Sequence, residues 1–207
     1  MYQGWVKAHS SGTGIFLSDR GKLMKNLFIC VICVTFFGLA GLKSAAAADL
    51  ENMLYLDLKD GRVVIELYPE KAPGHVERIK TLARKGFYNG IVFHRVIEGF
   101  MAQTGDPTGT GMGGSDLPDL KAEFNDTRHM RGTLSMARST DPDSANSQFF
   151  ICFTASPFLD GQYTAFGRVI KGMEFVDAIK RGDQADNGQV IDPDKIVKLQ
   201  VAADVKE

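Results

Sequence analysis

Apolar and polar positions alternate with a period of two in several short stretches of this chain, as in half-buried β-strands. The first two stretches, 52–58 and 62–67, flank the Gly-containing turn 59–61 and predict a β-hairpin. Many short strands separated by turns favour a closed or nearly closed antiparallel sheet. The further strand-like stretches are 92–97, 134–137, 148–153, 165–170 and 196–202.

Two other stretches show helical periodicity. Apolar side chains recur at helical spacing over 74–85, with basic residues between them, and Gly86 follows as a stop signal. The stretch 173–180 predicts a second, shorter helix. Neither a repeat nor a low-complexity linker divides these elements, so the pattern predicts one mainly β domain, a β-barrel with two α-helices.

The N-terminal part of the chain has the order of a secretory signal peptide. A charged start at 24–26 precedes the mainly apolar run 27–42, and small residues lead to Ala48 and Asp49. A membrane anchor is the alternative, but the run is short, contains glycines and lacks a basic stop-transfer flank. The pattern therefore predicts a signal peptide over 24–48, cleaved near Ala48/Asp49, with no stable membrane anchor.

Residues 1–23 precede this charged start, which is unusual for a signal peptide. We interpret them as the product of an upstream start codon or as an unstructured extension, with Met24 as the initiator. The mature domain is then 49–207, located in the periplasm or secreted.

Composition, charge and the spacing of cysteines and histidines exclude several classes of function. A chain of 207 residues with 44% apolar residues suits one hydrophobic core. Its 24 basic and 25 acidic residues form no long run of either sign, which excludes a nucleic-acid footprint. Cys30 and Cys33 lie inside the apolar run, and Cys152 among phenylalanines predicts a small buried hydrophobe and no disulfide. The scattered histidines lack metal-ligand spacing, so we expect neither metal nor cofactor.

The stretch 109–114 matches the G-x-G-x-x-G pattern of dinucleotide-binding proteins. That pattern must open a helix inside a βαβ unit, yet Pro118 stands where the helix interior would be. A glycine-rich loop beside a binding surface is the better interpretation.

Two other stretches suggest a binding face. If 92–97 is a strand, its alternation places Arg95 on one face with Phe93 and Ile97. A surface salt bridge is the alternative role for this arginine. The adjacent Phe149 and Phe150 must point to opposite faces, so one ring can fill the core while the other faces a ligand.

Seven separated runs, in their order and approximate spacing, resemble the signature of the cyclophilins, between about Met53 and Val201. The resemblance implies an eight-stranded antiparallel closed β-barrel capped by two α-helices, and peptidyl-prolyl cis/trans isomerase activity. The runs are Phe93-His94-Arg95, Gly99-Phe100-Met101-Ala102-Gln103, Gly105-Asp106, Gly111-Met112-Gly113-Gly114, Leu134-Ser135-Met136-Ala137, Ser147-Gln148-Phe149-Phe150-Ile151 and Leu159-Asp160-Gly161.

The resemblance also implies the site. Arg95 would be catalytic, and a proline-binding groove would be lined by Phe100, Met101, Gln103, Gly111, Ala137, Gln148, Phe150 and Leu159. Phe158, Tyr163 and Arg138 stand where the best-known pattern has Trp, His and Asn. We count these three residues among the substrate-binding set. Because Phe158 lacks the indole N–H of Trp, we expect weak cyclosporin binding.

The implied partners are proline-containing peptides and unfolded or partly folded exported proteins, bound by a monomer. The implied function is isomerisation of X-Pro bonds during the folding of exported proteins. The alternatives are a proline-recognising chaperone or binding module with little catalysis and, third, a membrane-anchored interaction protein.

Overall fold

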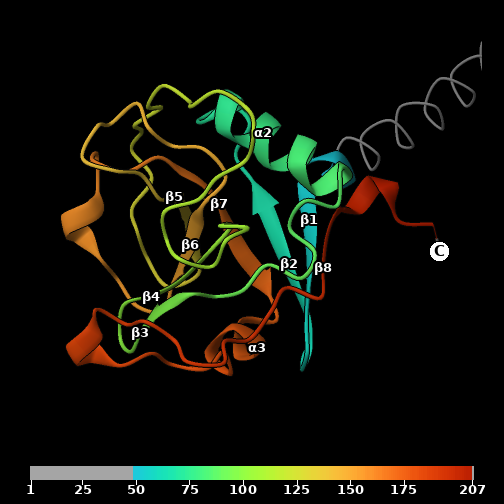
Figure 1. The fold of residues 1–207 in the computed structure, drawn as a ribbon. Helices are drawn as coiled ribbons and strands as arrows, with labels where there is room; N and C mark the ends of the chain where they lie inside the picture. The colour runs from blue at the N-terminus through green and yellow to red at the C-terminus, as the bar shows by residue number, and fades with distance from the viewer. Residues whose placement is uncertain (1–48, 207) are drawn as a thin grey trace, which may run out of the picture. The chain divides into compact units, whose positions relative to one another are not determined.

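The computed structural model describes residues 49–206, so the predicted signal peptide and the extension before it lie outside the described residues. Eight strands form one antiparallel sheet (Figure 1). Their bounds are β1 (Met53–Leu58), β2 (Gly61–Leu67), β3 (Arg95–Ile97), β4 (Met101–Thr104), β5 (Thr133–Met136), β6 (Phe149–Cys152), β7 (Ala165–Lys171) and β8 (Lys198–Val201).

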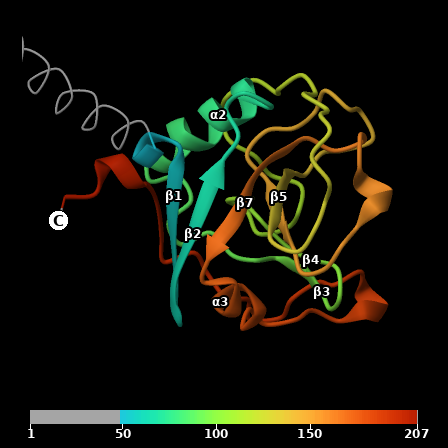
Figure 2. The same cartoon turned by 180° about the vertical axis from the view of Figure 1, so that it is seen from behind.

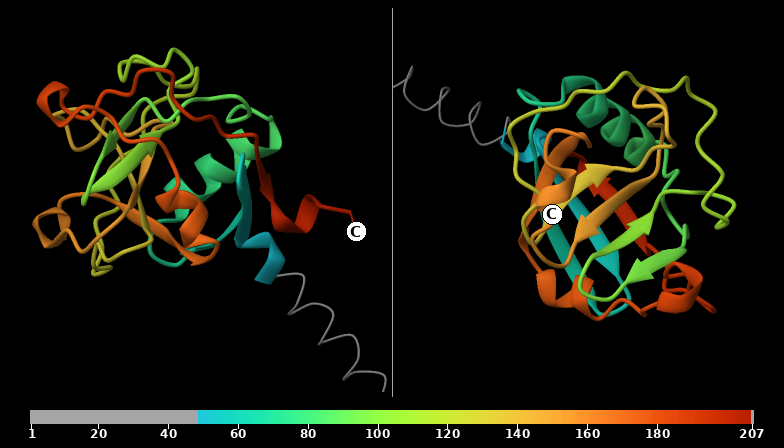
Figure 3. Two further views of the ribbon diagram at one scale, coloured as in Figure 1. Left: turned by 90° about the horizontal axis from the view of Figure 1, so that it is seen from below. Right: turned by 90° about the vertical axis from the view of Figure 1, so that its left-hand side faces the viewer.

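The strand order is β3-β4-β6-β5-β7-β2-β1-β8, which leaves β3 and β8 as the two edges of the sheet. The predicted closed barrel is therefore wrong, and the sheet is an open half-barrel whose curvature is visible from two directions in Figure 3. The outer side of β3 is covered by the loop before β8, since the N–H of Val96 donates to Gly188 O at 2.8 Å. A loop on an edge strand satisfies its backbone groups and prevents pairing with another chain.

The two predicted helices are present. Helix α2 (Pro73–Arg84) lies across one end of the curved sheet and the shorter α3 (Met173–Asp177) lies near the other end (Figures 1 and 2). The described part of the chain also contains three single 3₁₀ turns, η1 (Pro157–Leu159), η2 (Gln184–Asp186) and η3 (Ala202–Asp204), and a short helical segment at 49–51. None of the helices within 49–206 combines the length and the apolar character that a bilayer span requires.

The main core fills the space between the sheet and α2. Its centre is a set of edge-to-face aromatic pairs, with ring centroids 5.6 Å apart for Tyr88 and Phe149 and 6.1 Å apart for Phe149 and Phe166. The buried hydroxyl of Tyr88 donates to Ser147 O at 2.9 Å, so the core contains a satisfied polar group.

The structure corrects the pattern in two further places. Strand β4 was not predicted from the alternation of apolar and polar positions, because it is four residues long and three of them are buried. The expected shared face of Phe93 and Arg95 is also wrong. Phe93 precedes the three-residue strand β3 and packs in the main core, whereas Arg95 lies on the opposite side with Ile97.

Candidate active site

Cross-strand register gathers residues that lie far apart in the sequence. Arg95 on β3 pairs with Gln103 on β4, and Gln103 in turn pairs with Phe150 on β6. Side chains of residues paired across antiparallel strands stand on the same face of the sheet. One row across three strands thus presents a cation, an amide and an aromatic ring on the face opposite the main core.

A second apolar cluster, which we call the groove cluster, lies on this face. As the alternation predicts, Phe149 packs in the main core while Phe150 belongs to the groove cluster. Its rings include Phe150 and Tyr163, with centroids 6.0 Å apart. The groove cluster consists of the buried Met101, Phe150, Cys152 and Leu159 with the partly buried Ile97, Phe100, Ala137 and Tyr163.

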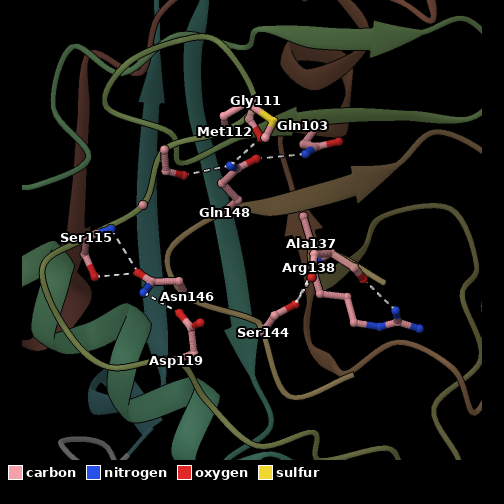
Figure 4. A pocket seen from close by; sticks show the side chains of 13 residues that line it. Gln103, Gly111, Met112, Ser115, Asp119, Ala137, Arg138, Ser144, Asn146 and Gln148 are labelled. Carbon is pink, nitrogen blue, oxygen red and sulfur yellow. Dashed lines mark hydrogen bonds between the residues drawn. The ribbon is translucent and has the colours of Figure 1, made fainter. Parts of the chain in front are cut away.

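Polar side chains continue from this cluster as a directed chain of hydrogen bonds. The amide nitrogen of Gln148 donates to the carbonyl oxygens of Gly111 and Gly113, at 3.0 and 2.8 Å. Its Oε1 accepts from Gln103 Nε2 at 2.9 Å (Figure 4). Gln103 Oε1 in turn accepts from Arg95 Nη1 at 3.1 Å. Because two carbonyls accept at one end and a guanidinium donates at the other, the orientation of both amides is determined.

Arg95 is half-buried beside the groove cluster. Burial lowers the pKa of its guanidinium below the ordinary value, and the nearby Tyr163 acts in the opposite direction. An arginine remains a cation in proteins, so Arg95 offers a charged donor in a partly desolvated place. Its other hydrogen bonds go to the main-chain and side-chain oxygens of Asn187, each at 3.0 Å.

The glycine-rich loop 109–114 opens no helix, as expected, and is shaped by Asp106. The buried carboxylate accepts hydrogen bonds from Thr108 N at 2.7 Å and from Gly111 N at 2.6 Å. Burial would raise the pKa of Asp106, but hydrogen bonds from Thr108, Gly113 and Gly111 outweigh it and lower the pKa to about 2. A Cβ at Gly113 would collide with this carboxylate, so only glycine fits there.

A hollow of about 560 Å³ opens between this loop and the segment after β5, and we call it the polar hollow (Figure 4). Of the predicted site residues it is lined by Gln103, Gly111, Ala137, Arg138 and Gln148. Its lining also includes Ser115, Asp119 and Asn146, which the sequence did not assign to the site. Among them, Asn146 accepts from Ser115 Oγ at 2.7 Å and donates to Asp119 Oδ1 at 2.9 Å.

The three residues that depart from the best-known pattern lie beside the groove cluster. The Arg138 guanidinium lies 4.4 Å from the centroid of the Tyr163 ring, and its Nη2 donates to Gln162 O at 3.0 Å. Phe158 is 62% exposed and its ring centroid lies 5.4 Å from that of Phe100. Of the twelve predicted site residues, five line the polar hollow and others belong to the groove cluster, and contacts such as that of Phe158 with Phe100 connect the rest to them.

A hydrogen-bonded relay of Ser135, His129 and Asp160 lies next to Phe150, and the sequence did not predict it. His129 stacks on Phe150 with ring centroids 6.3 Å apart. Its Nδ1 lies 2.9 Å from Asp160 Oδ1 and its Nε2 lies 3.0 Å from Ser135 Oγ. These contacts have the order of a serine hydrolase triad, but Ser135 is fully buried and no substrate reaches its hydroxyl. The relay therefore holds the ring.

Comparison with known proteins identifies the chain. Residues 53–201 match the sequence model of the family described as "Cyclophilin type peptidyl-prolyl cis-trans isomerase/CLD". The chain belongs to this cyclophilin family. A curated cyclophilin relative from Brucella suis, named "Probable peptidyl-prolyl cis-trans isomerase", is 53% identical over 179 residues, which cover 81% of this chain and 91% of the relative.

Two solved cyclophilins agree in fold. The crystal structure of AquaCyp293 from Hirschia baltica has a TM-score of 0.68 at 29% identity and covers 76% of each chain. A Cryptosporidium parvum cyclophilin, crystallised in the presence of the dipeptide Ala-Pro, has a TM-score of 0.67 at 31% identity and covers 72% of this chain and 98% of its own. The predicted enzyme class, peptidyl-prolyl cis-trans isomerase, is confirmed by the family and by these names.

Proposed function

We propose that this cyclophilin isomerises X-Pro bonds of polypeptides that bind along its groove, and that Arg95 is the catalytic residue. The observation that carries the proposal is the row formed by Arg95, Gln103 and Phe150, where a fixed charged donor lies beside the apolar groove cluster. The Ala-Pro dipeptide named with the Cryptosporidium parvum relative supports a proline-containing ligand.

Rotation about a peptide bond must overcome a barrier of about 18–20 kcal/mol that arises from conjugation of nitrogen with the carbonyl. The cis and trans X-Pro forms differ by only about 0.5–1 kcal/mol, so the catalyst needs to stabilise only the twisted transition state. In that state the prolyl nitrogen becomes pyramidal and regains a lone pair. A guanidinium N–H aimed at this lone pair binds the transition state more strongly than the planar ground state.

The groove cluster would hold the pyrrolidine ring among Phe100, Met101, Phe150 and Leu159 while the bond rotates. Reducing tens of seconds to milliseconds requires about 5–6 kcal/mol. One desolvated, charge-assisted hydrogen bond together with positioning supplies energies of this order. The reaction breaks no covalent bond and therefore requires no nucleophile, general base, metal or cofactor.

Substitution of Arg95 tests the mechanism. We expect Arg95→Ala to lower kcat/KM by about 10²–10³-fold, the scale seen when a preorganised donor is removed. Arg95→Lys keeps the charge but replaces the planar fork with a point donor, so it should recover only part of the activity. The measurement is isomerisation of a proline peptide, together with peptide affinity by titration.

A matched control is Arg62→Ala, since Arg62 pairs with Asp57 at 2.6 Å on the hairpin and lies outside the groove. It should leave kcat/KM unchanged. If affinity and kcat/KM fell in parallel in Arg95→Ala, Arg95 would be a substrate-binding residue, and the proline-binding module would become the better interpretation.

The physiological substrates we propose are exported proteins, and the first support is the signal peptide that the sequence pattern predicts over 24–48. The second is Cys152, a free cysteine that is fully buried in the groove cluster. Burial raises the pKa of its thiol to about 12, so it stays protonated and unreactive. Such a thiol is compatible with the oxidising compartments outside the cytoplasm, where exposed free cysteines form disulfides.

A further inference from the structure

Asn187 has an unusual backbone conformation next to the active site. With φ 51° and ψ 29° it is in the left-handed region, directly after η2 and before Gly188. Non-glycine residues are uncommon there, and asparagine is the side chain that tolerates it best. This conformation turns two oxygens of one residue toward Arg95.

The contacts of Asn187 occupy one edge of the Arg95 guanidinium. Arg95 Nε donates to Asn187 O at 3.0 Å, and Arg95 Nη2 donates to Asn187 Oδ1 at 3.0 Å. With the bond from Nη1 to Gln103 Oε1 at 3.1 Å, three of the five guanidinium N–H groups are engaged. One N–H on Nη1 and one on Nη2 remain for a ligand, and the plane of the fork is held on both sides.

The loop that carries Asn187 is itself attached to β3. Val96 N donates to Gly188 O at 2.8 Å, and Gly182 N donates to Val96 O at 2.9 Å. The loop is also closed on itself, because Gly188 N donates to Asp183 O at 2.7 Å. A Cβ at Gly182 or at Gly188 would collide with neighbouring atoms, so the approach is tight. The position of the two oxygens of Asn187 relative to Arg95 is therefore fixed by the fold.

We propose that Asn187 is a positioning residue for catalysis, which acts by holding the Arg95 guanidinium in the plane from which it reaches the prolyl nitrogen. The inference rests on the proposed role of Arg95 and adds a residue 92 positions away in the chain. A long arginine side chain loses rotamer freedom when it binds. Asn187 imposes that order before the substrate arrives, so its contribution should be seen in kcat more than in peptide affinity.

Asn187→Gly separates the side chain from the backbone turn. Glycine adopts the same φ without strain and keeps the main-chain acceptor, so only the Oδ1 contact is lost. We expect kcat/KM for a proline peptide to fall about five- to tenfold, with the Kd of the peptide changed by less than about twofold. Asn187→Asp keeps an oxygen acceptor and the tolerance for positive φ, and should retain activity within about twofold of the original protein.

The matched control is Asp192→Gly, at the other non-glycine residue with positive φ, 50°, within the described part of the chain. It relieves the same backbone strain and makes no contact with Arg95, so activity should not change. A double-mutant cycle gives the decisive comparison: in the Arg95→Ala background, Asn187→Gly should have no further effect.

The outcomes separate this inference from the proposed function. If Arg95→Ala itself left kcat/KM intact, the proposed role of Arg95 would fail. If Arg95→Ala lowered kcat/KM as expected but Asn187→Gly reduced kcat/KM by the same factor in both backgrounds, Asn187 would act independently of Arg95. An unchanged kcat/KM in Asn187→Gly alone would equally overturn the positioning role.

Discussion

At the scale of single residues, Phe158 shows how this groove differs from the best-known cyclophilin pattern. Its ring packs on Phe100, with 5.4 Å between the centroids, and the rest of it is exposed. Phenylalanine supplies an aromatic wall for a proline ring, which needs apolar contact. It has no N–H to donate, so ligands that depend on such a donor should bind less tightly.

We therefore expect Phe158→Trp to strengthen cyclosporin binding about fivefold, since one added hydrogen bond typically contributes on the order of 1 kcal/mol. Isomerase activity should change little because the aromatic wall remains. Phe124→Trp is the control, another exposed phenylalanine that is absent from the groove cluster. Titration of both variants with cyclosporin decides the matter, and an affinity of Phe158→Trp equal to that of the original protein would argue against the place assigned to Phe158.

The site residues that could be predicted from the sequence are those covered by a local pattern or by the family signature. The opposite directions of Phe149 and Phe150 follow from alternation alone, and the structure places the rings in the two separate clusters. Asn187 could not be found in this way, because the loop that carries it becomes a neighbour of Arg95 only through the tertiary fold. The Asn-Gly pair signals a turn in the sequence, but a turn signal does not say which side chain the turn will face.

At the scale of elements, α2 also has a contact that the sequence could not predict. The sequence predicts the helix from its apolar spacing and from the stop signal at Gly86, but the residue at its N-cap, Ala72, has no side-chain oxygen. The cap comes from Glu123, far along the chain, whose carboxylate accepts from the backbone N–H groups of Gly74 and His75, each at 3.0 Å. It also lies 2.6 Å from His75 Nδ1. A carboxylate at a helix N-terminus satisfies free donors and complements the helix dipole.

The charge states of this pair follow from their surroundings. Burial lowers the pKa of His75, although Glu123 acts in the opposite direction, and we assign a neutral ring that donates from Nδ1. Its buried Nε2 has no hydrogen-bond partner among residues 49–206, which fits an unprotonated nitrogen better than an N–H. Burial alone would raise the pKa of Glu123, but hydrogen bonds from His75 and Gly74 outweigh it and hold the pKa below its ordinary value.

Glu123→Gln should therefore destabilise the domain by about 2 kcal/mol and lower Tm by about 4–8 °C at pH 7. Its amide can accept only through one oxygen and lacks the charge. A depressed carboxyl pKa contributes stability above the unfolded pKa and loses it as the pH falls through the folded value. The difference in unfolding free energy between Glu123→Gln and the original protein should thus shrink from pH 7 to pH 3.

The control is Glu77→Gln on the exposed face of the same helix, where Glu77 accepts from Thr81 Oγ1 at 3.2 Å and from no other residue that the structure describes. It should change stability by less than about 0.5 kcal/mol. Equal effects of the two substitutions, or an effect of Glu123→Gln that does not depend on pH, would show that the carboxylate does not cap α2.

At the scale of the whole molecule, the closed barrel was predicted from the number of strands and from the family resemblance, and closure is the part that failed. Closure requires the two edge strands to pair, yet β3 has only three residues. The segment before β8 contacts that edge instead, through the isolated bridge of Arg95 with Gln189. The period of two detects strands but carries no information about which edges meet. The same coverage of the edge brings Asn187 to Arg95.

The termini of the described domain meet at α2, which bears on how the chain is processed. Glu51 pairs with Lys80 at 2.6 Å and with Arg84 at 2.7 Å, and Arg84 also pairs with Asp204 at 2.9 Å. Cleavage near Ala48/Asp49 would keep Glu51 and all of these contacts. We therefore expect a mature protein that begins near Asp49 and is recovered from the periplasm or medium. Its isomerase activity should equal that of domain 49–207 produced without the preceding residues.

Intact mass of the exported protein tests this processing, and two deletions make the test specific. A chain that starts at Met24 should give the same mature mass, because residues 1–23 are predicted to play no part in export. Deletion of the apolar run 27–42 should leave the protein uncleaved in the cytoplasm, because the apolar region is what the export machinery recognises. Full-length protein retained in membranes would favour the anchor instead. A mature mass that depended on residues 1–23 would show that Met24 is not the initiator.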